Sequence, residues 1–256
     1  MKRTTRNFLI AISLSVLIIV IVLLATDFNK SISYLASANP GWLFLTFCLT
    51  VGTWFFEAVT LKTFALMRSL TIPLTYLFKI TVIGTFFNGI TPFSSGGQPA
   101  QIVFMQRKGI SVGESTAMLV SRFLIYQSVI TVLGAAAIIK AYPIVVGRIS
   151  NLAVLSIFGF VLNSFVFAFL ILFSLNQGFT EKLIRLMINL LSRIRIIKDR
   201  DSMIEKALRE LRFFHSSMKC LIERPVTLVM ASLSTLAQLI CMISIPFFVS
   251  LSIGTP

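Results

Sequence analysis

The sequence has few of the residues on which most catalytic and metal sites depend: its 256 residues include one histidine and three cysteines. Because His215 is the single histidine, metal sites built from several histidines and most Ser-His-Asp triads are excluded. We expect His215 to occupy a polar position on a basic helix. Cys48, Cys220 and Cys241 show no Cys-x-x-Cys spacing, so they indicate neither a disulfide framework nor a metal site. A Gly-x-x-x-x-Gly-Lys loop is also absent, which argues against ATP drive within this chain. We therefore predict no metal, no cofactor and no catalytic residue.

Charged residues are scarce as well, at 12% of the sequence against 56% hydrophobic residues. A soluble domain would carry roughly twice that charged fraction, so the chain belongs to the membrane class. The net charge of +14 comes from clustered basic residues, three of them at 2–6 and eleven at 182–224. Retention of positive charge on the cytoplasmic side of a membrane gives this distribution. The sequence has no basic surface interleaved with aromatics, so we expect no nucleic-acid partner.

Residues 8–25 are uncharged and follow the basic N-terminal cluster. They predict a first transmembrane helix that is retained, because a signal peptide has a shorter apolar region and a small-residue cleavage site. The positive residues place the N-terminus in the cytoplasm. Residues 27–40 then form an outer loop, and residues 41–61 cross back inward.

The next apolar run spans residues 74–106, far more than the ~20 residues that cross a bilayer once. Basic residues flank it at both ends, so the run enters and returns on the same side. Polar and helix-breaking residues interrupt it at 91–99. We predict a re-entrant broken hairpin with one arm at 74–90 and a half helix at 100–106.

The break in this hairpin is the first candidate for a site. Backbone that leaves helical geometry at membrane depth must be covered by protein or a water-filled cavity, so we expect a buried, polar-lined segment. Gly96 and Gly97 permit close backbone approach and positive φ. Pro92 and Pro99 interrupt helical hydrogen bonding.

Ser111 and Glu114 match an N-terminal capping box, so a new helix is predicted to start there. The remaining predicted spans are 116–139, 151–175 and 226–253, the first two joined by an outer loop at 140–148. The sequence then ends at Pro256, and we expect the chain to continue beyond this point in the full gene.

Residues 179–222 differ in composition from the apolar spans. Their apolar residues recur at helical spacing, among eleven basic and six acidic residues between Glu181 and Arg224. Ser202 and Glu205 offer a second capping box. We predict two amphipathic cytoplasmic helices. They either lie on an anionic leaflet or form a solvated pair packed on the rest of the protein.

Three ionisable residues fall well inside the predicted spans: Glu57, Lys79 and Arg122. A charge at the bilayer centre costs at least ~2.5–3.5 kcal/mol and is usually paired or faces a cavity. We predict that Glu57 pairs with Lys79 or Arg122, which leaves one cation to face an anionic ligand. Alternatively, the long methylene chain of Lys79 lets its ammonium group reach the membrane–water interface.

These features resemble the membrane part of bacterial lysylphosphatidylglycerol synthases and the stand-alone flippase-like integral membrane proteins that share it. The matching residues are Phe87-Asn88-Gly89, Thr91-Pro92-Phe93, Gly96-Gly97-Gln98-Pro99-Ala100, Arg107-Lys108-Gly109-Ile110-Ser111 and Arg122. The family often has an acidic residue where Gln98 stands and an arginine where Gln101 stands. We expect a Gln98–Gln101 hydrogen bond in place of that charged pair.

The resemblance implies an all-α polytopic transmembrane bundle that binds an anionic or aminoacylated phospholipid, or another lipid-linked headgroup, and moves it between leaflets of the plasma membrane. The candidate substrate-binding residues are Glu57, Lys79, Asn88, Thr91, Ser94, Ser95, Gly96, Gly97, Gln98, Gln101 and Arg122. Two alternatives stay open. One is the membrane portion of a phosphatidylglycerol lysyltransferase whose catalytic domain is absent from this chain; the other is a structural or regulatory membrane protein. Phospholipid is the expected partner, and a homo-oligomer stays open.

Overall fold

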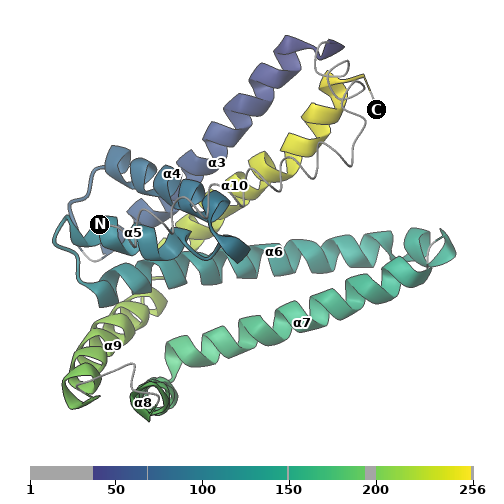
Figure 1. The fold of residues 1–256 in the computed structure, drawn as a ribbon. Coiled ribbons are helices and arrows are strands. Elements are labelled where there is room, and N and C mark those ends of the chain that lie inside the picture. Colours follow the sequence, from purple (N-terminus) through teal and green to yellow (C-terminus); the bar gives the residue numbers. More distant parts are fainter. Residues whose placement is uncertain (1–36, 68, 149, 194–199, 255–256) are drawn as a thin grey trace. The chain divides into compact units, whose positions relative to one another are not determined.

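A computed structural model of the chain describes residues 37–67, 69–148, 150–193 and 200–254. These residues are almost entirely helical and contain no strand, which confirms the predicted all-α fold class (Figure 1). The first predicted span, residues 8–25, lies outside the described residues. The helices are α3 (Pro40–Met67), α4 (Leu74–Ile90), η1 (Pro92–Ser94), α5 (Gly97–Gln106), α6 (Val112–Arg148), α7 (Ser150–Leu175), α8 (Gln177–Arg193), α9 (Arg200–Ile222) and α10 (Pro225–Ser252).

Four segments of these helices are long and apolar enough to cross a membrane: Pro40–Met67, Val112–Lys140, Phe158–Leu175 and Pro225–Ser252. α4, at 17 residues, is apolar but shorter. The four segments overlap the predicted spans at 41–61, 116–139, 151–175 and 226–253. The chain is therefore a polytopic helical membrane protein.

Two predicted boundaries are wrong. The outer loop expected at 140–148 is helical, because α6 continues without interruption to Arg148. The stretch contains no Ser, Thr, Asn or Asp and a single Gly, so it lacks the cluster of turn residues that marks a loop, and neither Lys140 nor Pro143 ends the helix. At the other boundary, α9 begins at Arg200, two residues before the cap predicted at Ser202.

The described residues form two compact units. The first contains residues 37–58, 75–104 and 237–254, and the second contains residues 59–74 and 105–236. In the first unit the N-terminal part of α3 packs on the C-terminal part of α10. The Asn39 N–H donates a 2.8 Å hydrogen bond to the Ser252 carbonyl, and the Trp42 and Phe248 rings stack with centroids 5.4 Å apart.

In the second unit α6 packs against both α7 and α9, and α8 packs on α9 (Figure 1). The predicted capping box is confirmed: the Glu114 N–H donates to Ser111 Oγ at 3.2 Å, and the Ser111 N–H donates to Glu114 Oε2 at 3.4 Å. Between them, the Gly113 N–H donates to Glu210 Oε2 of α9 at 2.6 Å. The side chains of Ser111, just before α6, and of Glu210 in α9 therefore satisfy two of the N–H groups that begin α6.

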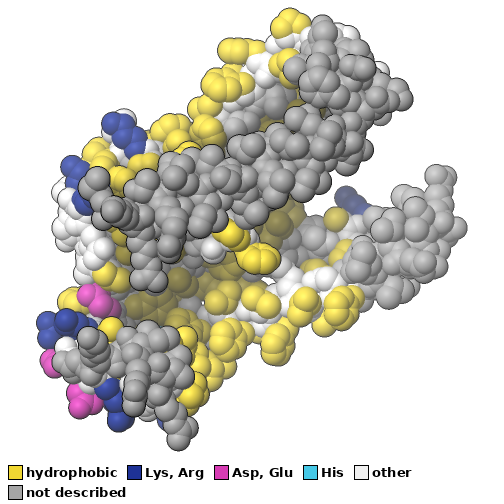
Figure 2. Space-filling view, viewed as in Figure 1, with side chains coloured by type: hydrophobic (Ala, Val, Ile, Leu, Met, Phe, Trp, Pro, Cys, Tyr) yellow, Lys and Arg dark blue, Asp and Glu magenta, His cyan; other side chains and the backbone are white. Residues whose placement is uncertain are grey.

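The surface of the second unit is divided by chemistry. Large apolar side chains of α7, such as Phe158, Phe165 and Phe169, are exposed, and Figure 2 shows hydrophobic side chains along this helix. Charged side chains gather over α8 and α9 in the same view. This contrast is what an apolar span followed by amphipathic helices requires, because lipid surrounds the first and water reaches the second.

Candidate functional site

The predicted break lies in an antiparallel hairpin of α4 and α5, which three hydrogen bonds tie together along its length. At the open end, the Tyr76 hydroxyl donates to the Phe104 carbonyl at 2.8 Å. In the middle, Gln101 Nε2 donates to the Ile80 carbonyl at 3.5 Å. At the turn, the Gly97 N–H donates to Asn88 Oδ1 at 2.9 Å. The two arms of the hairpin are therefore held in one register.

The turn between the arms is built around Thr91. Its hydroxyl donates to the Phe87 carbonyl at 2.6 Å, and its Oγ1 accepts from the Gly96 N–H at 2.9 Å. Phe93 and Ser94 take positive φ values of 56° and 53° inside η1. Such a conformation costs a non-glycine residue on the order of 1–3 kcal/mol and persists only where the surrounding structure imposes it. The bonds of Thr91 and Asn88 on either side of these residues impose it here.

The same hydrogen bonds satisfy backbone N–H groups at the start of α5. The Gly96 N–H is taken by Thr91 and the Gly97 N–H by Asn88, while Pro99 in the first turn has no N–H to satisfy. α5 therefore begins three residues earlier than predicted, because the Asn88 side chain caps it from α4. Little of this helix N-terminus is left to bind a ligand through backbone groups, so contacts to a ligand fall to side chains.

Glycines let the two arms approach closely. A Cβ on Gly97 would overlap Asn88 Oδ1 and would lie 2.6 Å from the Gly84 backbone oxygen. A Cβ on Gly84 would lie 2.7 Å from Gln101 Cδ. Gln101 is 3% exposed and faces α4, so the predicted hydrogen bond between Gln98 and Gln101 is not formed within the described hairpin. Gly84 carried no signal in the sequence beyond being a glycine inside an apolar helix.

The candidate residues of the break differ in exposure. Gly97 and Gln101 are buried, and Asn88, Thr91 and Gly96 are partly buried. Ser94, Ser95 and Gln98 are exposed, as is the ring of Phe93. The expectation of a wholly buried break is therefore wrong for the tip. Polar groups that bond the opposite arm turn inward, whereas Ser94 and Gln98 are exposed and the Ser95 hydroxyl donates to the Pro92 carbonyl within the turn at 2.9 Å.

The three charged candidates lie on different helices. Lys79 is exposed on α4, and Arg122 is partly buried on α6. Glu57 is partly buried on α3, and its Oε2 accepts a long hydrogen bond of 3.5 Å from Gln238 Nε2 of α10. The pairing of Glu57 with Lys79 or Arg122 stays a prediction. Gln238 was missed in the sequence, although an amide in the middle of an apolar span is a recognisable signal.

Within the described residues, no group of three or more His, Cys, Asp or Glu side chains is placed to hold a metal ion. The chemistry available at the hairpin is therefore binding through hydroxyl, amide and cationic groups. The exposed Ser94 hydroxyl and the Gln98 amide offer both donors and acceptors, and the Ser95 hydroxyl, which donates to the Pro92 carbonyl, offers its acceptor lone pairs.

Comparison with known proteins agrees with this architecture. Residues 8–256 match the family described as "Lysylphosphatidylglycerol synthase TM region". A UPF0104 membrane protein of Archaeoglobus fulgidus is 28% identical over 107 residues, which are 42% of this chain and 33% of that protein. The similarity thus spans about a third of that relative's length. No solved structure matches the chain. Since the family match covers nearly the whole sequence, the chain belongs to the lysylphosphatidylglycerol synthase transmembrane-region family.

Proposed function

We propose that this protein binds the headgroup of an anionic or aminoacylated phospholipid, such as lysylphosphatidylglycerol, or of another lipid-linked compound, and moves it between the leaflets of the plasma membrane. The observation that carries the proposal is the α4–α5 hairpin, in which a structured polar turn with exposed hydroxyl and amide groups joins two apolar arms. The family's own description, which names lysylphosphatidylglycerol, supports the lipid class.

The lengths of the two arms support a re-entrant placement. At ~1.5 Å per residue, the 17 residues of α4 are about 25 Å long and the 10 residues of α5 about 15 Å. The hydrocarbon core is about 30 Å thick, so α5 cannot cross it. The hairpin therefore enters and leaves on one side, which we assign to the cytoplasm together with the N-terminus, α8 and α9. Its polar tip then lies within the membrane, where a moving headgroup needs polar partners.

The side chains of the tip suit a headgroup better than an acyl chain. A phosphate or ammonium group that leaves water loses several kcal/mol of hydration unless new polar partners replace it, roughly 2.5–3.5 kcal/mol or more at the bilayer centre. Ser94, Ser95 and Gln98 supply neutral donors and acceptors for this exchange. Lys79 of α4 supplies a positive charge for an anionic group, while the acyl tails remain in lipid.

A proteoliposome assay tests the proposal. Purified protein is reconstituted with fluorescent lysylphosphatidylglycerol, and leaflet exchange is followed by quenching of the outer label, with labelled phosphatidylcholine as the lipid control. We expect faster exchange of the aminoacylated lipid than in protein-free vesicles. No exchange above protein-free vesicles would exclude this lipid as the substrate.

Two matched variants locate the site. Triple replacement of Ser94, Ser95 and Gln98 by alanine removes the exposed polar groups of the tip and is expected to slow exchange. Triple replacement of Thr46, Thr50 and Thr53 by alanine removes as many polar groups, but these lie on α3, outside the hairpin. It is expected to leave the rate unchanged. If both variants keep the wild-type rate, the hairpin is a structural device and not the binding site.

A further inference from the structure

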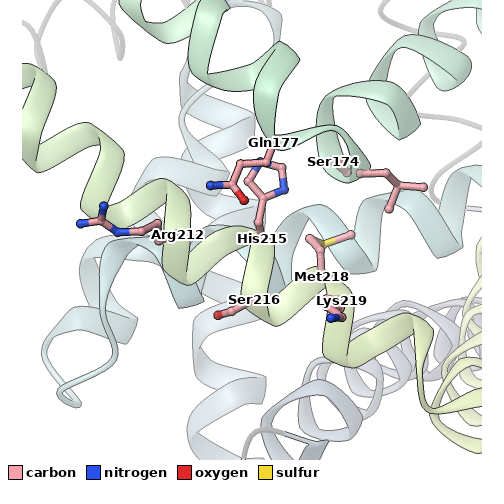
Figure 3. A pocket seen from close by; sticks show the side chains of 8 residues that line it. Ser174, Gln177, Arg212, His215, Ser216, Met218 and Lys219 are labelled. Atoms are coloured by element: carbon pink, nitrogen blue, oxygen red, sulfur yellow. The ribbon is translucent and has the colours of Figure 1, made fainter.

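A cavity lies within the second unit, where the end of α7 meets α8 and α9 (Figure 3). Its volume of about 490 Å³ falls in the range of small-molecule sites, ~300–1,000 Å³. Leu175, which ends the candidate membrane span of α7, forms part of its apolar wall. None of the eight lining residues is acidic. The cavity therefore joins the end of an apolar span to a polar, positively charged surface.

Ser174 supplies a polar group that the protein itself does not use. Its side chain is 0% exposed, and its Oγ has no hydrogen-bond partner in the part of the chain that the structure describes. Buried hydroxyls are nearly always paired, because an unpaired one loses its hydration without compensation. Ser174 lines the cavity, so a polar group that enters there can restore the missing bond.

His215 presents a second such group. Its imidazole forms a hydrogen bond with the Ser174 backbone and packs edge-on against Phe214 at a centroid distance of 5.1 Å. Its Nε2 is buried and has no partner among the described residues. Burial lowers the pKa of His215, and the bond to Ser174 partly opposes this. A hydroxyl group can both donate and accept, so a ligand hydroxyl can pair with Nε2 in either tautomer of the neutral ring.

Two permanent cations flank the imidazole on the same helix. Arg212 and Lys219 lie one turn before and one turn after His215, so all three share a face of α9 and line the cavity (Figure 3). Lys219 Nζ lies 4.0 Å from Glu223 Oε1, and both side chains are largely exposed. Such an exposed ion pair is weak, so another anion can replace the Glu223 carboxylate as the partner of Lys219. The Gln177 amide, at the start of α8, also lines the cavity.

We propose that this cavity binds a hydroxyl-bearing phosphate ester, either as a free metabolite or as a lipid headgroup. Arg212 and Lys219 hold the phosphate, the Ser174 hydroxyl donates to it, and His215 Nε2 pairs with a ligand hydroxyl. The site belongs to the second unit and does not rest on the transport proposal for the hairpin. It would give the cytoplasmic helices α8 and α9 a means to sense such compounds at the membrane surface.

The single histidine makes the test direct, because one imidazole Cε1–H signal in a ¹H–¹³C spectrum reports His215 alone. Protein without a histidine tag is titrated in detergent with glycerol 3-phosphate and with inorganic phosphate at constant pH and ionic strength. Nanodiscs of phosphatidylcholine with and without phosphatidylglycerol form the lipid arm. We expect a saturable shift of the signal with glycerol 3-phosphate, or a shift in the phosphatidylglycerol discs only. The first result identifies a free ester and the second a lipid headgroup.

Two double variants distinguish a specific binding site from general electrostatic attraction to a basic surface. Replacing Arg212 and Lys219 together by glutamine is expected to weaken binding about tenfold or more, the effect of losing charged hydrogen bonds. Replacing Lys206 and Arg209 of the same helix by glutamine removes the same charge outside the cavity and is expected to change affinity less than about twofold. No saturable shift in any arm, or equal weakening by the two double variants, would overturn the proposal.

Discussion

Replacement of Gly97 by alanine tests the central packing feature of the hairpin. The new Cβ would lie 2.6 Å from the backbone oxygen of Gly84 and would also overlap Asn88 Oδ1. Backbone cannot move aside as a flexible side chain can, so α4 and α5 must separate at the turn. The Asn88–Gly97 hydrogen bond, now 2.9 Å, would be lost with the separation.

The size of the effect follows from these two contributions. Overpacking a close contact costs about 1–3 kcal/mol. Loss of a helix cap costs about 0.5–2 kcal/mol. Together they predict a decrease in the free energy of unfolding of about 2–4 kcal/mol. For a chain of this size, that lowers the unfolding midpoint by roughly 5–15 °C.

Gly89 of α4 offers a matched control, because a Cβ there would meet nothing within 4 Å. Gly89→Ala is expected to leave stability unchanged or to raise it by up to about 1 kcal/mol, since alanine favours helix more than glycine does. Gly84→Ala should fall between the two, because its Cβ would meet the Gln101 side chain and not backbone. The assay is thermal unfolding in one detergent, followed by size-exclusion fluorescence and by circular dichroism. Equal midpoints for Gly97→Ala and Gly89→Ala would refute the close packing of the arms.

Three further outcomes are expected. Gly113→Ala should lower the stability of the second unit by about 1–3 kcal/mol in thermal unfolding, because its Cβ would overlap the Glu210 backbone oxygen where α6 meets α9; a wild-type midpoint would contradict this packing. The Gln127 amide of α6 donates to Asn163 Oδ1 of α7. A double-mutant cycle with leucine at both positions should give a coupling energy of about 0.6–1.7 kcal/mol. Additive effects of the two replacements would show that this hydrogen bond does not stabilise the contact between α6 and α7. Burial lowers the pKa of His215, so the folded state binds fewer protons than the unfolded state. The stability from this group is complete above the unfolded pKa of about 6.5 and is lost as the pH falls below it toward the folded pKa, so His215→Gln should show a smaller loss of stability between about pH 7.5 and 5.5 than the wild type does.

Some details were predictable because they are local. The first hairpin arm at 74–90 coincides with α4, since the apolar run begins after Pro73 and ends at the Thr91-Pro92 pair. The Ser111–Glu114 capping box is formed as expected, because both partners belong to one helical turn. The loop predicted at 140–148 is wrong: a charge and a proline were taken as a helix end, whereas the stretch has no cluster of turn residues and α6 continues to Arg148.

The sequence by itself determined the class of the protein, because few charges, clustered basic residues and apolar runs of span length leave only a helical membrane fold. It also marked the hairpin as the place where helices break. Only the tertiary structure decided how that break is used: Asn88 caps α5 from the opposite arm, Gln101 turns inward against Gly84, and the tip points outward. The cavity around His215 likewise unites helices whose residues are about forty positions apart. Such contacts depend on which helix faces meet in space, and no local pattern of hydrophobicity or charge specifies that choice.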